Sequence, residues 1–338
     1  MKVIQVRKYG EPEVLELSER ADPTPAPGQV VVRVHAAGIN FADILMRLGL
    51  YPGTPKPPFT PGIEAAGSVE AVGEGVDRLR VGERVIAFTF TGAYAEKIAV
   101  PAQRALPFPE GMTFEDAAAL PVNYLTAYQA LTYMAHLRAG ERVLIHAAAG
   151  GVGLAAIQLA KLAGAETFGT ASASKHDFLR QQGLAHAIDY HAQDFEEEIN
   201  RLTKGEGVDV VLDAVGGRSY RKSYRVLRQG GRLICFGMSA AVKGKGRSLK
   251  ALSAWWNTPS FNPLDMMVKN RAVIGVHLGQ MGRANPALVR TWMDEMFRLY
   301  ATGQIKPHIG KTFLLAEAAM AHHYIHDRRN IGKVLLIA

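Results

Sequence analysis

Hydrophobic residues in the first 120 positions or so occur in short runs that glycine and proline turns separate. The runs lie at 29–35, 67–72, 84–88 and 93–100. Short strands at this spacing are typical of a small barrel-like domain. The stretch 41–48 has a helical pattern, so we expect one short helix inside a β-rich domain.

A helix start marks the end of this domain. Thr113 is a suitable N-cap residue, and Glu115 and Asp116 place negative charge in the first turn, where the helix dipole favours it. Pro121 predicts a break, which a second helix at roughly 123–135 follows. We place the junction between two domains here.

Beyond residue 142 the pattern becomes an alternation of apolar strands and amphipathic helices. The expected strands are 143–146, 166–170, 187–190, 208–213, 232–237 and 272–276, and the expected helices are 154–163, 175–182, 195–203 and 219–227. Six strands with intervening helices are typical of a doubly wound parallel sheet. We therefore expect an α/β protein in which residues 123–281 form this domain, while residues 1–122 and 282–338 form the β-rich one.

Two further segments fall outside this alternation. The stretch 239–269 contains Trp255 and Trp256, and it is either a lid over a cleft or a packing or dimer element. The tail from Pro286 onward predicts two helices and a closing strand at 333–338. We expect this tail to return to the first domain.

The turn after the first strand of the second domain predicts a phosphate site. Its sequence, from residue 147, is AAAGGVG, and it joins the apolar run 142–146 to the small-residue helix 154–163. A glycine-rich strand-to-helix turn lets the backbone approach a pyrophosphate, which the helix N-terminus attracts. The candidate residues are Gly150, Gly151, Val152 and Gly153. Because Ala148 replaces the first glycine of the usual pattern, a tight turn without a ligand stays open as the alternative.

The residues after the second strand predict which dinucleotide binds. NAD-specific folds place a carboxylate there to bind the ribose 2′-hydroxyl, whereas no acid occurs in this chain before Asp177. Ser172, Ser174 and Lys175 would instead hold a 2′-phosphate through hydroxyl donors and a point charge. Tyr190, which ends the next strand, would add its hydroxyl or stack near the adenine. We therefore expect NADPH as cofactor; the alternative is that Ser172 and Ser174 cap the following helix.

Further cofactor contacts are expected where other strands end, because ligands of such sheets bind at the carboxyl edge. These candidates are Thr170, Phe236, Gly237, Met238, His277 and Leu278. Thr126, in the junction helix, would contact the phosphate–ribose end of the cofactor or simply pack.

Composition and charge narrow the class of protein. One cysteine among 338 residues, Cys235 in an apolar run, excludes a disulfide framework and multi-cysteine metal sites. The net charge of +8 favours anionic ligands, but no nucleic-acid motif accompanies it. The first residues contain no apolar h-region and no cleavage site, so we expect no secretory signal. No uncharged apolar run approaches the roughly 18 residues that span a bilayer. We expect a cytoplasmic protein.

Several longer strings resemble the zinc-free quinone oxidoreductases of the medium-chain dehydrogenase/reductase superfamily. They are GINFAD from residue 38, PGIEAAG from residue 61, NYLTAY from residue 123 and the AAAGGVG turn. The strings GTASASKH from residue 169 and IKPHI from residue 305 most resemble the branch of the synaptic vesicle membrane protein (vesicle amine transport protein) homologues. The resemblance implies a GroES-like catalytic domain with a Rossmann domain, an active site between them, and a homodimer joined along the last Rossmann strand.

The resemblance also indicates how the protein would work without a metal. Ile63 stands where zinc-dependent relatives have a metal-binding histidine, so no metal ligand is expected and Glu64 is assigned a structural role. Hydride transfer without a Lewis acid suits quinones and α,β-unsaturated carbonyls, which delocalise the incoming charge themselves. Asn40 would orient the nicotinamide ribose or the substrate oxygen, or satisfy its own loop. Tyr51 would donate to a developing oxyanion or form an aromatic wall, and Lys333 would reach the cofactor or lie at the surface.

The expected function is thus the reduction of a small quinone or enone by NADPH, without zinc, in a homodimer. An alternative from another class is an NADPH-binding protein with little turnover that associates with membranes or partners. The basic stretch 243–250 and the neighbouring tryptophans motivate this alternative.

Overall fold

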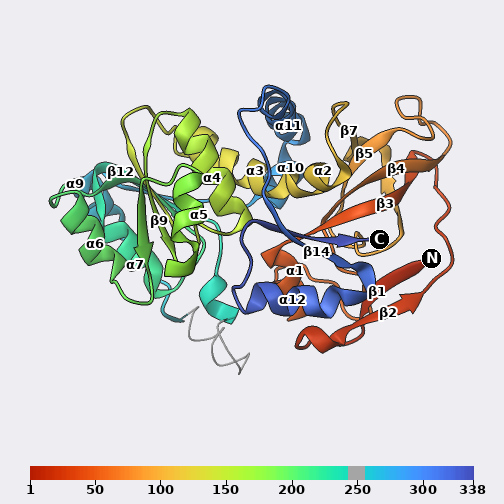
Figure 1. The fold of residues 1–338 in the computed structure, drawn as a ribbon, viewed down its shortest axis with the longest axis horizontal. Helices are drawn as coiled ribbons and strands as arrows, with labels where there is room; N and C mark the ends of the chain where they lie inside the picture. The colour runs from red at the N-terminus through yellow and green to blue at the C-terminus, as the bar shows by residue number, and fades with distance from the viewer. Residues whose placement is uncertain (243–255) are drawn as a thin grey trace. The chain divides into compact units, whose positions relative to one another are not determined.

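A computed structural model describes residues 1–242 and 256–338, and the chain forms two compact units (Figure 1). One unit comprises Met1–Val122 and Pro307–Ala338, and the other comprises Asn123–Lys306. The division falls inside helix α3 (Pro121–Tyr128). The return to the first unit begins at Pro307, whereas the sequence pattern placed it at residue 282.

Helices α10 (Leu278–Ala284) and α11 (Pro286–Ala301) account for this difference, because both belong to the second unit. The buried Trp292 of α11 has its ring centroid 6.0 Å from that of Tyr128 and 4.9 Å from that of Tyr133. Aromatic packing of this kind holds α11 on the second unit. The part of the tail that belongs to the first unit therefore starts only after α11.

The first unit is built on a seven-stranded sheet with the order β14-β15-β3-β4-β5-β7, in which β6 also pairs with β3. All its pairs are antiparallel except β14 with β15. A separate hairpin pairs β1 with β2. The elements are β1 (Lys2–Val6), β2 (Leu15–Glu19), β3 (Gln29–Ile39), α1 (Phe41–Arg47), β4 (Glu64–Val72), β5 (Arg84–Phe88), β6 (Lys97–Pro101), β7 (Ala105–Pro107), α2 (Phe114–Ala119), β14 (Ile309–Leu314), α12 (Ala318–His326) and β15 (Lys333–Ile337).

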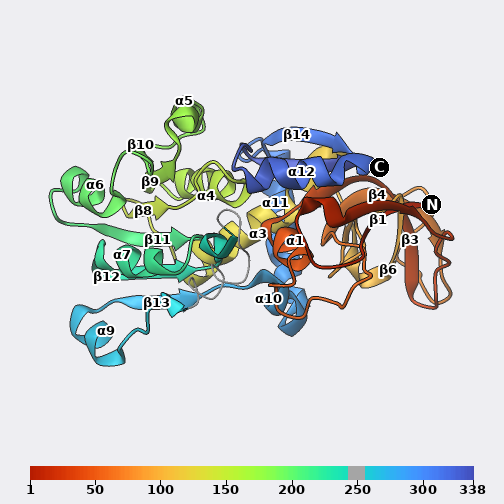
Figure 2. The ribbon, with the colours of Figure 1, turned by 90° about the horizontal axis from the view of Figure 1, so that it is seen from below.

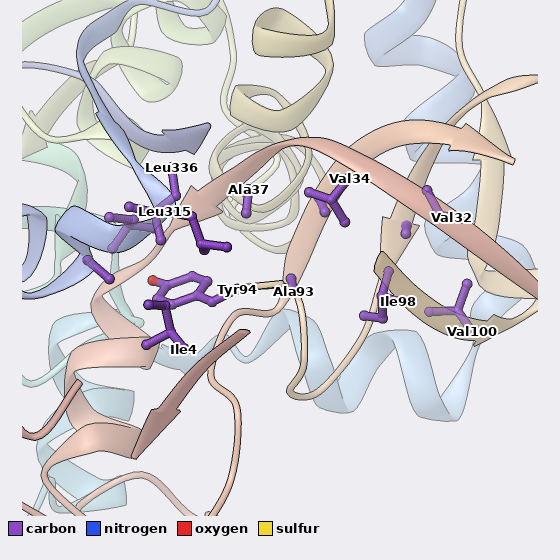
Figure 3. Packing of buried hydrophobic residues seen from close by; sticks show 14 of the residues in the cluster. Ile4, Val32, Val34, Ala37, Ala93, Tyr94, Ile98, Val100, Leu315 and Leu336 are labelled. Carbon is purple, nitrogen blue, oxygen red and sulfur yellow. The ribbon is translucent and has the colours of Figure 1, made fainter. Parts of the chain in front are cut away.

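The core of this unit lies against one face of the long strand β3 (Figure 3). Alternate valines of β3, among them Val32 and Val34, pack with Ile98 and Val100 of β6. The two-residue period puts these side chains on one side of the sheet. Each large apolar side chain buried in this way stabilises the fold by about 1.5–3 kcal/mol, so this face holds the β-rich unit together.

The predicted helix start at Thr113 is confirmed. The Thr113 Oγ1 atom accepts a hydrogen bond from the Asp116 N–H over 3.0 Å, and α2 follows. Pro121 then begins α3, which continues as one wider π-helical stretch, Gln129–Met134. The break at proline arises because its ring cannot donate the next helical hydrogen bond.

The second unit contains the predicted doubly wound sheet (Figure 2). The six strands among its described residues are all parallel and have the order β10-β9-β8-β11-β12-β13. The elements are β8 (Arg142–Ile145), α4 (Gly151–Leu162), β9 (Glu166–Ala171), α5 (His176–Gln181), β10 (His186–Asp189), α6 (Phe195–Leu202), β11 (Val208–Asp213), α7 (Arg218–Arg225), β12 (Leu227–Cys235), α9 (Pro263–Lys269) and β13 (Ala272–Gly275). The order reverses between β8 and β11, and ligands of such sheets bind at the carboxyl ends of the strands near this point.

The stretch 239–269 is described only in part. It begins with a short 3-10 turn, Ser239–Val242, and ends in α9. Trp255 and the basic stretch 243–250 lie outside the described residues, whereas Trp256 is 79% exposed. Within the described residues, no helix combines the length and the apolar character needed to cross a membrane.

Candidate functional site

The turn between β8 and α4 brings main-chain atoms close together. The Ala148 N–H donates to the Thr170 carbonyl over 3.1 Å, and the Gly150 N–H donates to the Ala147 carbonyl over 2.9 Å. A Cβ atom on Gly153 would lie 2.5 Å from the carbonyl oxygens of Ala147 and Ala148. This distance is far inside van der Waals contact, so only glycine lets the helix start this close to the strand.

The other two glycines of the turn have different surroundings. Among the described residues, a Cβ on Gly150 would meet only the Ala147 carbonyl oxygen, at 3.3 Å, whereas a Cβ on Gly151 would collide with the side chain of Asn123. Gly150 is the N-cap residue of α4, and Val152 lies partly exposed in its first turn. The first N–H groups of a helix have no acceptor within the helix, so this end can hold an anion.

The end of β9 carries the polar groups that were predicted to bind a 2′-phosphate. Thr170 is buried in the strand, and the Oγ atoms of Ser172 and Ser174 lie 3.5 Å apart just after it. Ser172 is at the N-cap position of a short 3-10 helix, Ala173–Lys175, without a capping hydrogen bond from its side chain. The capping role considered for Ser172 is therefore not the one the structure shows.

The neighbouring strand β10 brings a tyrosine to the same edge. Asp189 of β10 is in register with Ala171 of β9, so Tyr190 and Ser172 are the next residues along adjacent strands. Tyr190 is 37% exposed. The first acidic side chain after β9, Asp177, is exposed and forms an ion pair with Arg180 at 2.8 Å.

Residues after β12 were also predicted to contact the cofactor. The strand ends at Cys235, so Phe236, Gly237 and Met238 follow the strand instead of ending it. All three are partly exposed, and the Gly237 carbonyl accepts a hydrogen bond from the Tyr220 hydroxyl over 2.6 Å. Burial raises the pKa of the Cys235 thiol to about 12, so this side chain is an unreactive thiol at neutral pH.

The prediction that His277 and Leu278 end the last strand is wrong. β13 ends at Gly275, and His277 is the N-cap residue of α10, which Leu278 begins. The His277 Nδ1 atom accepts a hydrogen bond from the Gln280 N–H over 3.2 Å, and this cap ends the extended chain. Thr126, in α3, has a buried side chain.

In the first unit, Asn40, Glu64 and Lys333 form a buried polar cluster, with side chains that are 7%, 0% and 3% exposed. The Lys333 Nζ atom donates to Asn40 Oδ1 over 2.7 Å and also to Glu64 Oε1. The Asn40 Nδ2 atom donates to Glu64 Oε1 over 2.8 Å and to the Gly38 carbonyl over 3.3 Å. Lys333 is thus no surface lysine. Sequence reasoning missed its pairing with Glu64, because 269 positions separate the two.

Glu64 also holds the start of α3. Its Oε2 atom accepts a hydrogen bond from the Val122 N–H over 2.9 Å. A Cβ atom on Gly38 of β3 would lie 2.6 Å from Glu64 Oε1 and 2.7 Å from the Lys333 Cε atom. A glycine inside a strand often marks such a close approach, so Gly38 was the signal in the sequence that could have pointed to this cluster.

Asp43 extends the cluster into the interior. Its Oδ2 atom accepts hydrogen bonds from the Asn40 N–H over 2.8 Å and from the Tyr94 hydroxyl over 3.1 Å. The Tyr94 hydroxyl oxygen is 3.2 Å from the His322 Nε2 atom. Burial raises the pKa of Asp43 to about 7 and lowers the pKa of His322. Asp43 therefore ties the start of α1 to the core.

Tyr51 packs on the core of the first unit beside Phe90. The two ring centroids are 6.4 Å apart, the rings are tilted by 43°, and both side chains are partly exposed. The pair presents aromatic surface, and both roles considered for Tyr51, the aromatic wall and the oxyanion donor, stay predictions. Phe90 had not been singled out from the sequence.

A metal site is not found in the part of the chain that the structure describes. There, no three His, Cys, Asp or Glu side chains lie close enough together to hold an ion. The Glu64 carboxylate, which follows Ile63, forms an ion pair with the Lys333 ammonium.

Comparison with known proteins gives strong matches along the whole chain. A family described as zinc-binding dehydrogenase matches residues 182–336, and the alcohol dehydrogenase GroES-like domain matches residues 26–110. The synaptic vesicle membrane protein VAT-1 homolog of Homo sapiens is 42% identical over 341 residues, which cover 100% of this chain and 86% of that protein. Escherichia coli quinone oxidoreductase complexed with NADPH superposes with a TM-score of 0.88 at 33% identity, over 100% of both chains. The CurK enoyl reductase gives a TM-score of 0.85 at 33% identity, covering 99% of this chain and 98% of that one.

These matches identify the class of protein. The first unit contains the GroES-like domain, and the second is a Rossmann domain with the strand order described above. The chain belongs to the medium-chain dehydrogenase/reductase superfamily, in which it groups with the VAT-1 homologues and the quinone oxidoreductases.

Proposed function

We propose that this protein is an NADPH-dependent reductase of quinones or α,β-unsaturated carbonyls that works without zinc. The observation that carries the proposal is the edge formed by β9 and β10, where Ser172, Ser174, Lys175 and Tyr190 stand and where the first acid is the paired Asp177. Hydroxyl donors and an ammonium favour a 2′-phosphate, which a carboxylate at this place would repel. The similar quinone oxidoreductase of Escherichia coli was solved with NADPH.

The residues of the second unit would divide the work of holding the cofactor. NADPH, when bound, supplies a hydride. The main chain from Gly150 to Gly153, with Gly151 and Val152 between them, would hold the pyrophosphate at the N-terminus of α4, and Lys175 would neutralise the 2′-phosphate. Thr126, Thr170, Phe236, Gly237, Met238, His277 and Leu278 would supply the remaining contacts.

The hydrogen bonds of Asn40 favour one of the two ligand roles considered for it. Both Nδ2 hydrogens have acceptors, Glu64 Oε1 and the Gly38 carbonyl, while Oδ1 accepts from Lys333. Asn40 therefore lacks a further N–H for a substrate oxygen, and its hydrogen bond to the cofactor would be one that its Oδ1 atom accepts from a ribose hydroxyl. Lys333 and Glu64 act as the residues that position the Asn40 amide.

The aromatic pair Tyr51 and Phe90 supports a flat, conjugated substrate. Partly exposed rings bury apolar planar surfaces well, and the Tyr51 hydroxyl is a donor that can meet a developing oxyanion. A quinone or enone spreads the incoming negative charge over its own conjugated system, so orientation and a few hydrogen bonds suffice. The similar CurK protein is an enoyl reductase.

Zinc independence is part of the proposal, although one of the matching families is described as zinc-binding. Ile63 offers no ligand atom, and Glu64 is engaged by Lys333. The Cys235 thiol, with its raised pKa of about 12, disfavours the thiolate that binds zinc.

A homodimer joined along β13 is the third part of the proposal. β13 is the last strand of the sheet and has only β12 as a partner among the described strands. The adjacent helix α9 exposes Leu264, Met267 and Val268 to 66%, 66% and 74%. An open strand edge beside an apolar helix face suits pairing with a second copy of the same sheet.

The decisive experiment follows NADPH absorbance with a panel of quinones and enones. The protein is first dialysed against a chelator, and NADH serves as the matched cofactor. Turnover with NADPH that zinc does not increase supports the proposal. Tight NADPH binding with no turnover on any substrate, together with sedimentation on anionic liposomes, would support the membrane- or partner-associated alternative instead.

A further inference from the structure

A chain of buried polar side chains connects the carboxyl ends of three strands in the second unit. His146 directly follows β8, Thr170 lies near the end of β9 and Asp213 ends β11, while Ser223 comes from α7. Their side chains are at most 4% exposed. The His146 Nδ1 atom is 3.0 Å from Thr170 Oγ1, its Nε2 atom is 3.1 Å from Ser223 Oγ, and Ser223 Oγ is 2.7 Å from Asp213 Oδ2.

The direction of these hydrogen bonds follows from the Asp213 carboxylate. Its Oδ1 atom accepts from the N–H groups of Val215 and Gly216, over 2.7 and 3.1 Å. Its Oδ2 atom accepts from the hydroxyls of Ser219 and Ser223, both over 2.7 Å. A serine hydroxyl has one proton, and Ser223 donates it to Asp213. Ser223 can therefore only accept from His146.

His146 is then held in one tautomer. Its Nε2 atom must carry the proton that Ser223 accepts. Burial lowers the pKa of His146, so the ring is neutral and its Nδ1 atom is an acceptor. Thr170 must consequently donate to Nδ1. All three hydrogen bonds therefore point the same way: Thr170 donates to His146, His146 donates to Ser223, and Ser223 donates to Asp213.

The same residues hold the glycine turn to β9. The Thr170 hydroxyl donates to the His146 ring, and the Thr170 carbonyl accepts from the Ala148 N–H over 3.1 Å. Both oxygen atoms of Thr170 are thus bound to the segment that opens the turn. Ser172, the first residue of the proposed 2′-phosphate site, follows only two residues later. A shift of Thr170 would therefore displace that site relative to Gly150.

We infer that His146 is a positioning residue for the dinucleotide, held by Ser223 and Asp213 so that its ring fixes Thr170 against the glycine turn. The inference rests on the proposed NADPH binding. It also refines the role of Thr170. Its only hydroxyl proton is used by His146, so Thr170 offers a phosphate oxygen no donor and acts by placing Ser172 and its neighbours.

The test compares two serines that differ in one contact. Ser223→Ala removes the group that holds His146, whereas Ser219→Ala removes the other hydroxyl on the same Asp213 oxygen without touching His146. NADPH affinity is measured by titration calorimetry, and folding by thermal unfolding. We expect Ser223→Ala to raise the NADPH Kd by about five-fold or more with kcat little changed, and Ser219→Ala to raise it by less than about two-fold. Equal effects of the two variants would overturn the inference.

A second readout does not depend on the cofactor. The 15N chemical shifts of the His146 ring distinguish its two tautomers, and His146→Gln assigns the signals. We expect the Nε2–H form in the unmodified protein and in Ser219→Ala, and a mixture of both forms in Ser223→Ala. An Nδ1–H form in the unmodified protein contradicts the inference. If the unmodified protein bound no NADPH while showing the Nε2–H form, the proposed function and the positioning role would both be wrong. Only the direction of the hydrogen bonds from Thr170 to Asp213 would then be confirmed.

Discussion

Lys333 and Glu64 form an ion pair in the interior of the first unit, where their side chains are 3% and 0% exposed. Two charges removed from water in this way are tolerated because each has further partners. Glu64 accepts from Asn40 and from the Val122 N–H, and Lys333 donates to Asn40. A buried pair with such partners specifies one arrangement of β4, β15 and the loop before α1.

Removing one member of this pair is expected to destabilise the protein strongly. Lys333→Met leaves the Glu64 carboxylate buried without its ammonium, which costs about 3–5 kcal/mol, whereas the double variant with Glu64→Gln costs less than the sum of the single changes. Urea unfolding measures these free energies. Arg7→Met is the matched control, because Arg7 and Glu16 form an exposed pair worth at most about 1 kcal/mol. Similar losses at both pairs would contradict the expectation.

The pH dependence of the unfolding free energy is expected to include a contribution from the titration of Asp43. Burial raises its pKa to about 7, above the unfolded value of about 3.9. The folded state then holds the proton more tightly, so this contribution is present below about pH 4 and is lost as the pH rises through about 7. The unfolding free energy of the unmodified protein relative to Asp43→Asn should fall across this window, by at most about 1.4 kcal/mol per pH unit. A difference that stays constant between about pH 5 and 8 would exclude this titration.

Alanine substitutions at two glycines of the β8–α4 turn are expected to have different effects, one on stability and the other on NADPH binding. Gly153→Ala brings a methyl group to 2.5 Å from two carbonyl oxygens, so it should lower the unfolding temperature markedly. Gly150→Ala meets one carbonyl at 3.3 Å and should change stability little. It should nevertheless weaken NADPH binding, because its methyl group stands where the pyrophosphate approaches the backbone. Thermal unfolding and calorimetry separate the two effects. Equal destabilisation by both substitutions would show that the close packing at Gly153 is unimportant.

Lys175→Ala is expected to weaken NADPH binding by about ten-fold or more while changing NADH affinity much less, because only NADPH has a 2′-phosphate to pair with the ammonium. Fluorescence titration with both cofactors measures this ratio. Arg180→Ala, which removes the same charge from α5 where it pairs with Asp177, is the control and should leave the ratio unchanged. An equal loss for both cofactors after Lys175→Ala would remove Lys175 from the 2′-phosphate site.

Val268→Asp is expected to produce monomers if β13 and α9 join two copies. Val268 is 74% exposed in the described chain, and a carboxylate there would be buried without a partner in a dimer. Analytical ultracentrifugation gives the mass. Met320→Asp introduces the same charge on the exposed face of α12 in the first unit and should leave the mass unchanged. A monomeric unmodified protein would contradict the dimer.

Much of the second unit could be predicted from the sequence, because local periodicity carries the information. Every predicted strand there overlaps one of the observed six, and the turn opens α4 at Gly151. The cap at Thr113 could also be read, because a threonine three residues before an acid is a local signal. The prediction that His277 ends the last strand was wrong for the opposite reason. The His277 side chain accepts a hydrogen bond from the Gln280 N–H and so starts a helix, and an apolar run in the sequence does not reveal at which residue the strand gives way to that helix.

The sequence by itself determined the alternation of strands and helices, the glycine turn and the polar edge after β9, because each depends on neighbours a few positions away. Only the tertiary structure decided that Lys333 meets Glu64 across 269 positions and that Asp213 reaches His146 through Ser223. These contacts depend on which strands lie side by side. Strand order arises from packing of the whole chain, so no local pattern of residues records it.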